Sequence, residues 1–534
     1  MMVATKKLAS KNNGLVRCTL AAAIAALLAT GFPVIARADA IDNLLEKLKA
    51  KGVISEEEYQ EVLETREGEK AVARKRKQEQ SEKDTKAEER AKTEMVGSFS
   101  DGLRLETADK KNSISLGGRI QLDYRNFSGD DALIANTFDV RRAYLTVQGK
   151  FWDYYTFDLT GDFAGLAGST QVQTNTSAST CTSLPCTDPN TTSATLNSRQ
   201  SSHLDVAWFN AAWWQSAQLR FGQFKMPMSL EEQTSSRFLD FQERSIMNAF
   251  VPAKERGIML HGTPTPGLFY GVAISTGEGK NNNENTPSVD GNDFIGRVGV
   301  NIAEFVGQKN AVYHLAGAYS IGKIAPSSPP TGRTEGRGVN FFTTAEAFSG
   351  GDVERTRTGL EAAVAYGPIK FQGEYLKANY SGHSADIASA APGGAITPGI
   401  DYDRGIDVWY AGVNWLISGE TYADNYKNGA FGRIRPKANF SPSGTGWGAW
   451  ELGVRYTNFD ASDFKTTNQS GTGKLSGNAT NKVSAYTLGV KWMPTPNTRF
   501  LLNYVKSDFD KTVTQNSKKT DDEKAITFRA QFDF

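Results

Sequence analysis

The chain has 534 residues and carries 60 lysines and arginines against 59 aspartates and glutamates. This near balance argues against a nucleic-acid-binding protein, which needs a basic excess. With 4 histidines, 3 cysteines and no CxxC or HxxxH spacing, we expect no zinc site built from cysteine and histidine clusters, and no other metal or cofactor.

The first 38 residues have the pattern of a Sec signal peptide. Four basic residues open it: Lys6, Lys7, Lys11 and Arg17. The apolar run TLAAAIAALLA follows, and small residues end the segment at Ala36 and Ala38. The run is well short of the ~20 residues that a spanning helix needs. We therefore expect cleavage after Ala38 and export of the mature chain from the cytoplasm.

Residues 39–95 predict a separate helical segment. Apolar residues recur at helical spacing at Ile41, Leu44, Leu45 and Leu48. Gly52 suits the position just after a helix, and Ser55 with Glu58 forms a capping box that opens a second helix. After Arg66 the segment is dense in charges of both signs and cannot bury a core of its own. Two interpretations stay open: a periplasmic coiled coil or spacer, self-associating around a trimer axis, or a solvated tail without a partner.

From about residue 100, apolar and polar residues alternate as they do in β-strands. In the last ten residues, Ile526, Phe528, Ala530, Phe532 and Phe534 share one face, while Thr527, Arg529, Gln531 and Asp533 share the other. The stretches SISLGGRIQLDY, YTFDLTGDF, DVWYAGVNW and AYTLGVKWMP continue the pattern. In a membrane barrel the apolar face meets lipid and the polar face lines water.

Counting such stretches gives about 16, each near the ~9–11 residues that a tilted spanning strand needs. No later stretch is long and apolar enough to span a membrane as a helix, so a spanning chain must close into a barrel. The predicted fold is all-β: a 16-stranded antiparallel transmembrane β-barrel over residues 100–534. A soluble array of β-sandwiches is the alternative, but it would need several cores and linkers, and this region lacks linker composition.

The longest departure from strand alternation in the first half is residues 225–256, KMPMSLEEQTSSRFLDFQERSIMNAFVPAKER. The segment has proline near both ends and scattered apolar residues, so it is more than a turn. We expect it to fold inward as a constriction loop that narrows the pore. The alternative is an extracellular loop that lies on top of the barrel.

Three stretches together, GQFKMPMSLEEQTSSRF, ERSIMNAF and FDVRRAYLTVQGKF, resemble the phosphate-selective porin O and porin P family. The resemblance covers the signal peptide, the helical segment and the whole barrel. It implies a homotrimer in the outer membrane of a Gram-negative bacterium, with a site for oxyanions at the constriction loop.

The adjacent arginines of FDVRRAYLTVQGKF, Arg141 and Arg142, interrupt a strand. Arg142 shares its face with Tyr144, and Arg141 lies beside a break in the alternation, where a β-bulge could turn both guanidiniums inward. A lipid-facing arginine at the midplane costs ~2–4 kcal/mol, so the lumen is the favoured location. There the pair could bind phosphate oxygens through its N–H donors, or it could pair with lumen carboxylates such as Asp158 or Asp162.

By resemblance, Arg141, Arg142 and Tyr144 match the arginine pair and aromatic residue of the family's site. Asp205 matches an aspartate that keeps the anion from binding too tightly, and Ser235 and Ser236 match loop hydroxyls. The chain departs from the family at Glu232, where the family has lysine, and at Lys225, where it has an aromatic residue or aspartate. The candidate anion site therefore comprises Arg141, Arg142, Tyr144, Asp205, Arg220, Lys225, Ser235 and Ser236.

Further cations fall on the predicted lumen face, and such a ladder could draw anions inward. They are Arg119, Arg125, Arg220, Arg297, Arg357, Arg455, Lys491 and Arg529. Carboxylates on the same faces oppose them: Asp123, Asp158, Glu361, Glu374 and Glu451.

The leading hypothesis is passive, anion-selective diffusion of phosphate, pyrophosphate or polyphosphate through a pore in the lipid bilayer. A general porin of the same fold, or a tether between outer membrane and cell wall with incidental conductance, are the alternatives. Four scattered histidines without a nucleophile motif argue against an enzyme. Cys181 and Cys186 lie in a polar insertion, where a disulfide is plausible in the periplasm.

Overall fold

The structure, a computed structural model, describes residues 43–99, 102–128, 135–164, 204–277, 279, 292–351, 353–388 and 394–534. The expected signal peptide and the expected disulfide between Cys181 and Cys186 lie outside these ranges. The chain divides into two compact units, Met1–Lys92 and Thr93–Phe534. None of the helices in the described ranges has both the length and the apolar character needed to cross a membrane.

In the first unit, a helix over residues 43–50 turns into α3 (Glu56–Thr93). Gly52 has a φ of 67°, and the Val53 amide donates to the Leu48 carbonyl at 3.0 Å, which closes a Schellman turn. The Ser55 amide donates to the Glu58 carboxylate at 2.9 Å, and the Glu58 amide donates to Ser55 Oγ at 3.2 Å. The predicted helix end and capping box are therefore confirmed.

Helix α3 is polar nearly all round. Its described side chains are almost all exposed, and no apolar stripe runs along it beyond Val72 and Ala73. A helix of this kind depends on local charge pairs rather than on a buried seam. The role of residues 39–95 stays a prediction, and both interpretations, a coiled coil or spacer and a solvated tail without a partner, stay open.

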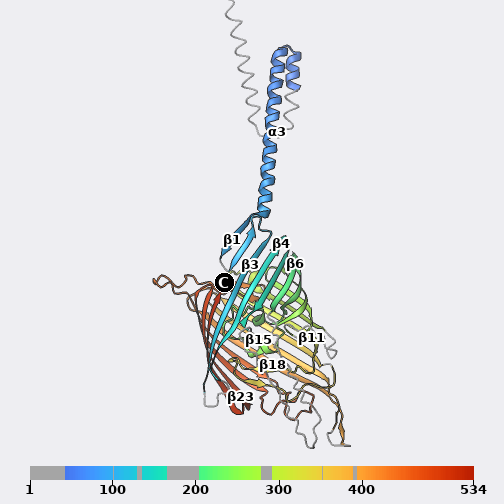
Figure 1. Cartoon of the computed structure of the whole chain (residues 1–534), viewed down its shortest axis with the longest axis vertical. Coiled ribbons are helices and arrows are strands. Elements are labelled where there is room, and N and C mark those ends of the chain that lie inside the picture. The colour runs from blue at the N-terminus through green and yellow to red at the C-terminus, as the bar shows by residue number, and fades with distance from the viewer. Residues whose placement is uncertain are drawn as a thin grey trace, which may run out of the picture. The chain divides into compact units, whose positions relative to one another are not determined.

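In the second unit, the described strands include 16 that form a closed antiparallel barrel, and Figure 1 shows this barrel as a ribbon. The barrel strands in chain order are β3 (Ser113–Ser128), β4 (Thr137–Phe151), β5 (Tyr155–Asp162), β6 (Leu204–Trp214), β7 (Ala217–Lys225), β8 (Lys254–Thr265), β9 (Leu268–Ser275), β10 (Asp293–Asn301), β11 (Ala311–Ile324), β14 (Val353–Tyr366), β15 (Ile369–His383), β18 (Asp401–Leu416), β21 (Ala449–Asp460), β22 (Lys482–Thr495), β23 (Thr498–Gln515) and β24 (Lys518–Asp533). Pairing of β24 with β3, from Lys524↔Ser128 to Asp533↔Arg119, closes the ring. The predicted fold class is confirmed.

A hairpin of β1 (Met95–Phe99) and β2 (Leu103–Thr107) joins the barrel at its closing seam. β2 pairs with β3 from Leu103↔Leu116 to Glu106↔Ser113, just beyond the point where β24 ends. The Gly118 amide donates to the Phe534 carbonyl at 2.7 Å between the two pairings. One edge of β3 is thus shared between the first hairpin and the last strand.

The barrel wall sorts its residues by parity, as the sequence predicts. On β3, Ile120 is 51% exposed and Leu122 43%, whereas Gln121 and Asp123 between and beside them are fully buried. β24 repeats the pattern, with apolar residues outward and polar residues inward. The exposed apolar side chains form the surface that lipid covers, because the bilayer core is as apolar as they are.

The arginine substitution Leu488→Arg should destabilise the barrel by ~2–4 kcal/mol, because Leu488 lies midway along β22 on the lipid face. The free energy of unfolding in urea, measured after refolding into lipid vesicles, tests this. Leu488→Met, which keeps an apolar side chain of similar volume, is the matched control. Equal stabilities of the two variants would contradict the lipid-facing assignment.

The predicted constriction loop is confirmed over residues 226–253, between β7 and β8. It contains α4 (Leu230–Gln233) and η2 (Ile246–Ala249), and its apolar residues Met226, Met228 and Met247 are buried. The loop reaches distant strands: the Gln242 amide donates to Asn503 Oδ1 on β23 at 3.0 Å. A loop lying on top of the barrel could not make these contacts with the wall.

A second inward segment, residues 417–448 between β18 and β21, enters from the opposite end of the barrel, since neighbouring strands alternate in direction. It contains η3 (Ala423–Asn425), β19 (Tyr426–Lys427) and β20 (Ala430–Phe431). The Phe431 amide donates to Thr234 Oγ1 of the constriction loop at 3.4 Å. The two segments therefore meet inside the barrel.

The other loops carry short elements. These are α5 (Ile302–Phe305), β12 (Gly332–Arg333), β13 (Asn340–Phe342), β16 (Ile387–Ala388) and β17 (Ile396–Thr397). The loop with β12 and β13 also folds inward, because Glu335 accepts from Arg455 on β21 at 2.7 Å.

Candidate functional site

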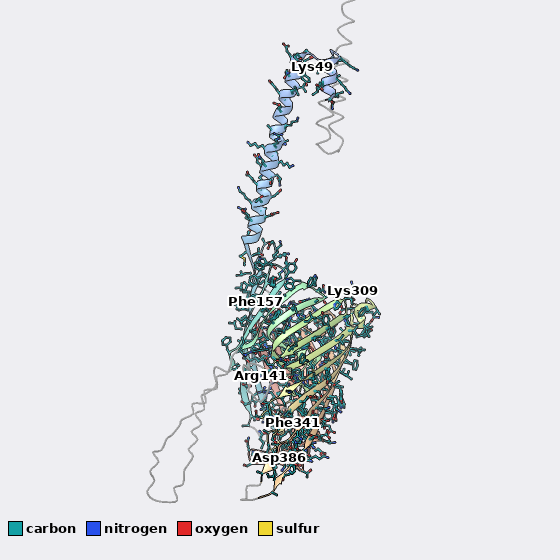
Figure 2. The ribbon with its side chains drawn as sticks, turned by 90° about the vertical axis from the view of Figure 1, so that its right-hand side faces the viewer. Lys49, Arg141, Phe157, Lys309, Phe341 and Asp386 are labelled. Atoms are coloured by element: carbon teal, nitrogen blue, oxygen red, sulfur yellow. The ribbon has the colours of Figure 1, made fainter. Side chains whose placement is uncertain are left out.

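The arginine pair lies at a β-bulge in β4. Gln121 pairs with Arg142 and Leu122 pairs with Val140, so Arg141 is an extra residue without a partner in the ladder. The bulge restores the alternation on both sides, because Val140 and Leu145 are both exposed to the lipid side. Both guanidiniums thus turn into the lumen, as the broken parity predicts, and Figure 2 marks Arg141 on the barrel.

Arg141 forms an ion pair with the constriction loop. Its Nε lies 2.9 Å from Glu243 Oε1, and its Nη2 lies 3.4 Å from Glu243 Oε2. Neither Asp158 nor Asp162, the carboxylates considered from the sequence, takes this place. Arg141 therefore braces the loop against the wall.

Arg142 belongs to a different group of contacts. Its Nη1 donates to Gln121 Oε1 at 3.0 Å, and Gln121 Nε2 donates to the Ser236 carbonyl at 3.2 Å. Arg119 Nη1 donates to Ser236 Oγ at 3.1 Å, and the Arg119 guanidinium lies 4.4 Å from the centre of the Tyr144 ring. We name Arg119, Gln121, Arg142, Tyr144 and Ser236 the arginine–serine cluster.

The arginine–serine cluster holds positive charge without a matching carboxylate. Within the described ranges, no carboxylate lies at ion-pairing distance from Arg119 or Arg142, and Arg119 Nε is buried without a hydrogen-bond partner. Buried donors of this kind are costly when unpaired. An oxyanion could satisfy them.

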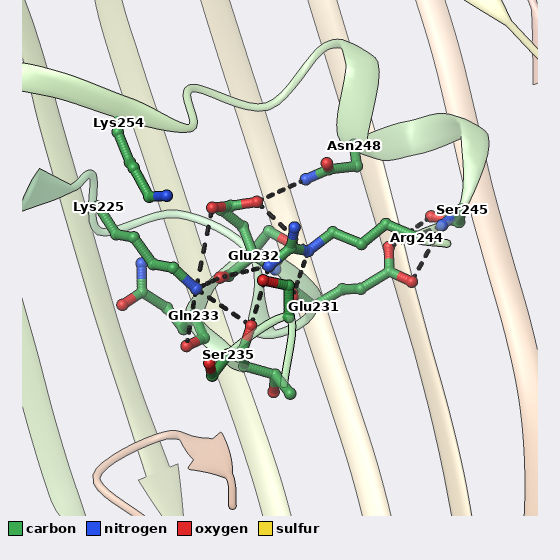
Figure 3. Close-up of polar contacts among 12 residues, drawn as sticks. Lys225, Glu231, Glu232, Gln233, Ser235, Arg244, Ser245, Asn248 and Lys254 are labelled. Carbon is green, nitrogen blue, oxygen red and sulfur yellow. Dashed lines mark hydrogen bonds and ion pairs between the residues drawn. The ribbon is translucent and has the colours of Figure 1, made fainter. Parts of the chain in front are cut away.

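Lys225 lies outside the cluster. Its Nζ donates to the carbonyls of Glu232, Gln233 and Thr234, the last of these at 3.1 Å, and lies 3.9 Å from Glu232 Oε1. Figure 3 shows Lys225 pointing toward Glu232 and Gln233. These carbonyls end the short helix α4, which a cation stabilises. Lys225 thus holds the loop in shape, with its donors occupied.

Asp205 is paired with a lysine that the sequence analysis missed. Lys254 Nζ, on the first residue of β8, lies 2.5 Å from Asp205 Oδ2, and 6.0 Å from the Tyr144 ring centre. The ion pair therefore lies beside the arginine–serine cluster. Its lysine could have been suspected only from its place at the end of the inward loop.

Two further candidates do not join the cluster. Arg220 lies on β7 with its guanidinium 4.3 Å from the centre of the Trp208 ring. Ser235 Oγ accepts from the Arg237 amide at 3.3 Å and shapes a local turn. The structure thus brings Arg142, Tyr144 and Ser236 together and places Asp205 nearby, whereas the polar and ring contacts of Arg141, Arg220, Lys225 and Ser235 described above are made with other residues.

Most of the expected ladder cations are paired with carboxylates. The pairs are Arg125–Asp123 (2.6 Å), Arg297–Glu361 (2.6 Å), Arg357–Asp293 (2.7 Å), Arg455–Glu335 (2.7 Å), Lys491–Glu451 (2.8 Å) and Arg529–Asp123 (2.6 Å). Six of the eight expected lumen cations therefore have a carboxylate within ion-pairing distance, and the expected carboxylates Asp123, Glu361 and Glu451 are among these partners. The charge of these six cations is compensated locally, and this sharpens the contrast with Arg119 and Arg142.

Glu243 is the carboxylate most strongly surrounded by cations on the constriction loop. Burial would raise its pKa, but the guanidiniums of Arg141 and Arg529 outweigh burial and hold the pKa well below its ordinary value. Glu243 therefore stays ionised at neutral pH.

Comparison with known proteins places the chain among channels. Residues 114–534 match the sequence model of the family described as phosphate-selective porin O and P. The chain is 22% identical over 454 residues to Porin O of Pseudomonas aeruginosa. The aligned region covers 81% of this chain and 91% of that protein.

Among solved structures, the fold is similar to that of OmpT, an outer membrane protein of Vibrio cholerae, at 8% identity, over 79% of this chain and 98% of that chain, with a TM-score of 0.43. The outer membrane channel DcaP of Acinetobacter baumannii is 12% identical over 79% of this chain and 97% of that chain, with a TM-score of 0.41. These likenesses are too distant to add weight. The family match, over most of the chain and the whole closed barrel, makes this an outer-membrane channel that belongs to the phosphate-selective porin O and P family.

Proposed function

We propose that this porin is an anion-selective channel whose constriction binds phosphate or related oxyanions in passing. The observation that carries the proposal is the arginine–serine cluster: two lumen guanidiniums and a loop hydroxyl meet where no carboxylate of the described chain pairs with them. Planar guanidiniums match the oxygens of phosphate through paired N–H donors.

The neighbouring ion pair supports release as well as capture. Conduction needs a site that attracts the ion but lets it leave. The ion pair between Asp205 and Lys254, at 2.5 Å, adds no net charge beside the cluster, so the donors of the arginine–serine cluster supply the attraction for the anion without a further cation. The arrangement therefore suits brief binding rather than storage.

The wider setting follows from the family. We infer a homotrimer in the outer membrane of a Gram-negative bacterium, exported through the signal peptide of residues 1–38, with small anions passing each barrel. No reaction is catalysed in this mechanism, because the solute only exchanges water for the N–H and O–H donors of the wall.

Purified protein in planar bilayers tests the proposal. Under a potassium chloride gradient the reversal potential should have the sign of an anion-selective pore, and added phosphate should reduce the chloride current. Sulfate at equal ionic strength serves as the comparison anion. A pore without ion preference, unaffected by phosphate, would overturn the proposal.

A general porin is the second candidate. The local pairing of most lumen cations with carboxylates, as in Arg297–Glu361 and Lys491–Glu451, favours it. It predicts chloride current that phosphate leaves unchanged and measurable passage of neutral sugars in a liposome-swelling assay.

A further inference from the structure

One carboxylate of the constriction loop lies in a nest of guanidiniums. Four arginines from three elements of the wall and one inward loop approach Glu243. The shortest nitrogen–oxygen distances are 2.9 Å for Arg141, 2.9 Å for Arg529, 3.6 Å for Arg125 and 3.7 Å for Arg337. We name these four residues the arginine nest.

The nest has a buried floor and an open rim. The side chains of Arg529 and Arg125 are 1% and 6% exposed, whereas those of Arg141 and Arg337 are 21% and 35% exposed. Asp123 already pairs with both floor arginines, at 2.6 Å each. Among the described residues, Glu243 is the carboxylate at ion-pairing distance from the rim arginines, so the compensation of their positive charge depends on Glu243.

The rim arginine Arg337 is held in place from behind. It lies in a turn with a φ of 64°, and its amide donates to the Thr334 carbonyl at 2.9 Å. Glu523 on β24 accepts from Thr334 Oγ1 at 2.9 Å and from the Val339 amide at 2.7 Å. The turn therefore presents its arginine to the nest without needing Glu243.

The loop backbone at the nest is likewise anchored independently of the Glu243 side chain. The Gln242 amide donates to Asn503 Oδ1 at 3.0 Å, and Arg455 Nη2 donates to the Glu243 carbonyl at 3.2 Å. Arg529 Nη1 also donates to the Gln242 carbonyl. The carboxylate can therefore leave the nest while the loop stays.

We propose that the arginine nest is a second oxyanion-binding site of the channel, and that Glu243 is a tethered competitor that fills it when no solute is bound. A carboxylate and a phosphate present the same kind of oxygen acceptors to guanidinium forks. A solute oxyanion would take the donors of Arg141 and Arg337 as the glutamate turns away. The proposal deepens the proposed function and rests on it.

The competitor explains how so dense a cluster of arginines avoids trapping its solute. An unopposed nest would bind a multivalent anion tightly and block the pore, because several charge-assisted hydrogen bonds would form at once. A tethered carboxylate returns as soon as the solute leaves. The Glu243 carboxylate thereby replaces the solute anion on the arginines as the anion leaves, and passage of the solute stays fast.

Glu243→Gln, which removes the charge but keeps the shape, tests the proposal in planar bilayers. Phosphate should halve the chloride current at an about tenfold lower concentration than in the wild type, the factor that ~1.4 kcal/mol gives, and the blocked intervals should lengthen. Adding Arg337→Gln to this variant should remove most of the gain.

Glu335→Gln is the charge-matched control. Glu335 also lies on an inward loop, but it pairs with one guanidinium, that of Arg455, which keeps Glu231 as a second partner at 3.0 Å. If Glu335→Gln shifts the half-blocking concentration as far as Glu243→Gln does, net charge accounts for the effect and the nest proposal is overturned. Wild-type behaviour of Glu243→Gln overturns it too.

Two measurements keep the test decisive. Should Glu243→Gln fail to fold, Glu243→Asp, whose shorter side chain is a weaker competitor, must shift the block in the same direction, and no shift refutes the nest. Should the wild-type pore lack anion preference, the proposed function fails. Phosphate titrated calorimetrically into wild type and Glu243→Gln in detergent then still decides whether the nest binds oxyanions.

Discussion

Replacing Arg119 or Arg142 with glutamine is expected to weaken phosphate block of the chloride current and to lower the preference for anions. A hydrogen bond to a charged group contributes ~1.5–3 kcal/mol, so each single variant should raise the half-blocking phosphate concentration by about tenfold or more. The double variant should abolish block. Planar-bilayer reversal potentials and phosphate titrations measure both effects.

Two controls separate charge from loop position. Arg404→Gln removes a cation whose guanidinium donates to the Thr472 carbonyl at 3.0 Å, away from the cluster, and it should leave phosphate block unchanged. Ser236→Ala removes the loop contact of Arg119 but keeps both charges, and it should retain the anion preference. Unaltered selectivity in a folded double variant would refute the role of the arginine–serine cluster.

The barrel itself could be predicted from the sequence because the alternation that marks each strand is visible within that strand alone. Parity along β3 and β24 places each side chain toward lipid or water without reference to any other strand. The bulge was predictable for the same reason: Val140 and Leu145 can both face lipid only if one extra residue lies between them. The alternation of apolar and polar residues was therefore enough to predict which side chains of the barrel wall face lipid, and that the arginine pair points into the lumen.

The charge partners could not be predicted, because they depend on how the loop crosses the lumen. Arg141 and Glu243 are 102 residues apart, and nothing in either neighbourhood marks the other. Lys225 was a candidate anion-site residue that departs from the family pattern, yet its ammonium group donates to the carbonyls of Glu232, Gln233 and Thr234 at the end of α4. The position of a cation on the lumen face leaves its partner open, and the partner decides whether it is free to bind an anion.

The second inward segment was missed for a related reason. Residues 417–448 lack strand alternation and have the polar, glycine-containing composition of an ordinary loop. Its anchors are aromatic: Tyr422 and Phe431 are buried inside the barrel. Aromatic residues scattered through a polar stretch carry too little pattern to show which way the stretch folds.

Lys370→Met is expected to raise the single-channel conductance by releasing both inward segments. Lys370 Nζ lies 2.7 Å from both carboxylate oxygens of Asp240 on the constriction loop. It also lies 4.9 Å and 4.4 Å from the ring centres of Tyr422 and Phe431 on the second inward segment. Breaking a buried ion pair by removing one partner costs ~3–5 kcal/mol, and here the loss is concentrated where the two segments meet.

Asp240→Asn divides the effect between the two segments. It removes the ion pair with the constriction loop but leaves the Lys370 ammonium over the two rings, contacts that contribute ~0.5–2 kcal/mol. Its conductance should therefore lie between those of the wild type and Lys370→Met, with fewer open-state fluctuations than the lysine variant. If Lys370→Met conducts like the wild type while its barrel stays folded in a heat-modifiability gel, the segments are held by their other contacts. Lys370 would then not be needed to hold the two inward segments together.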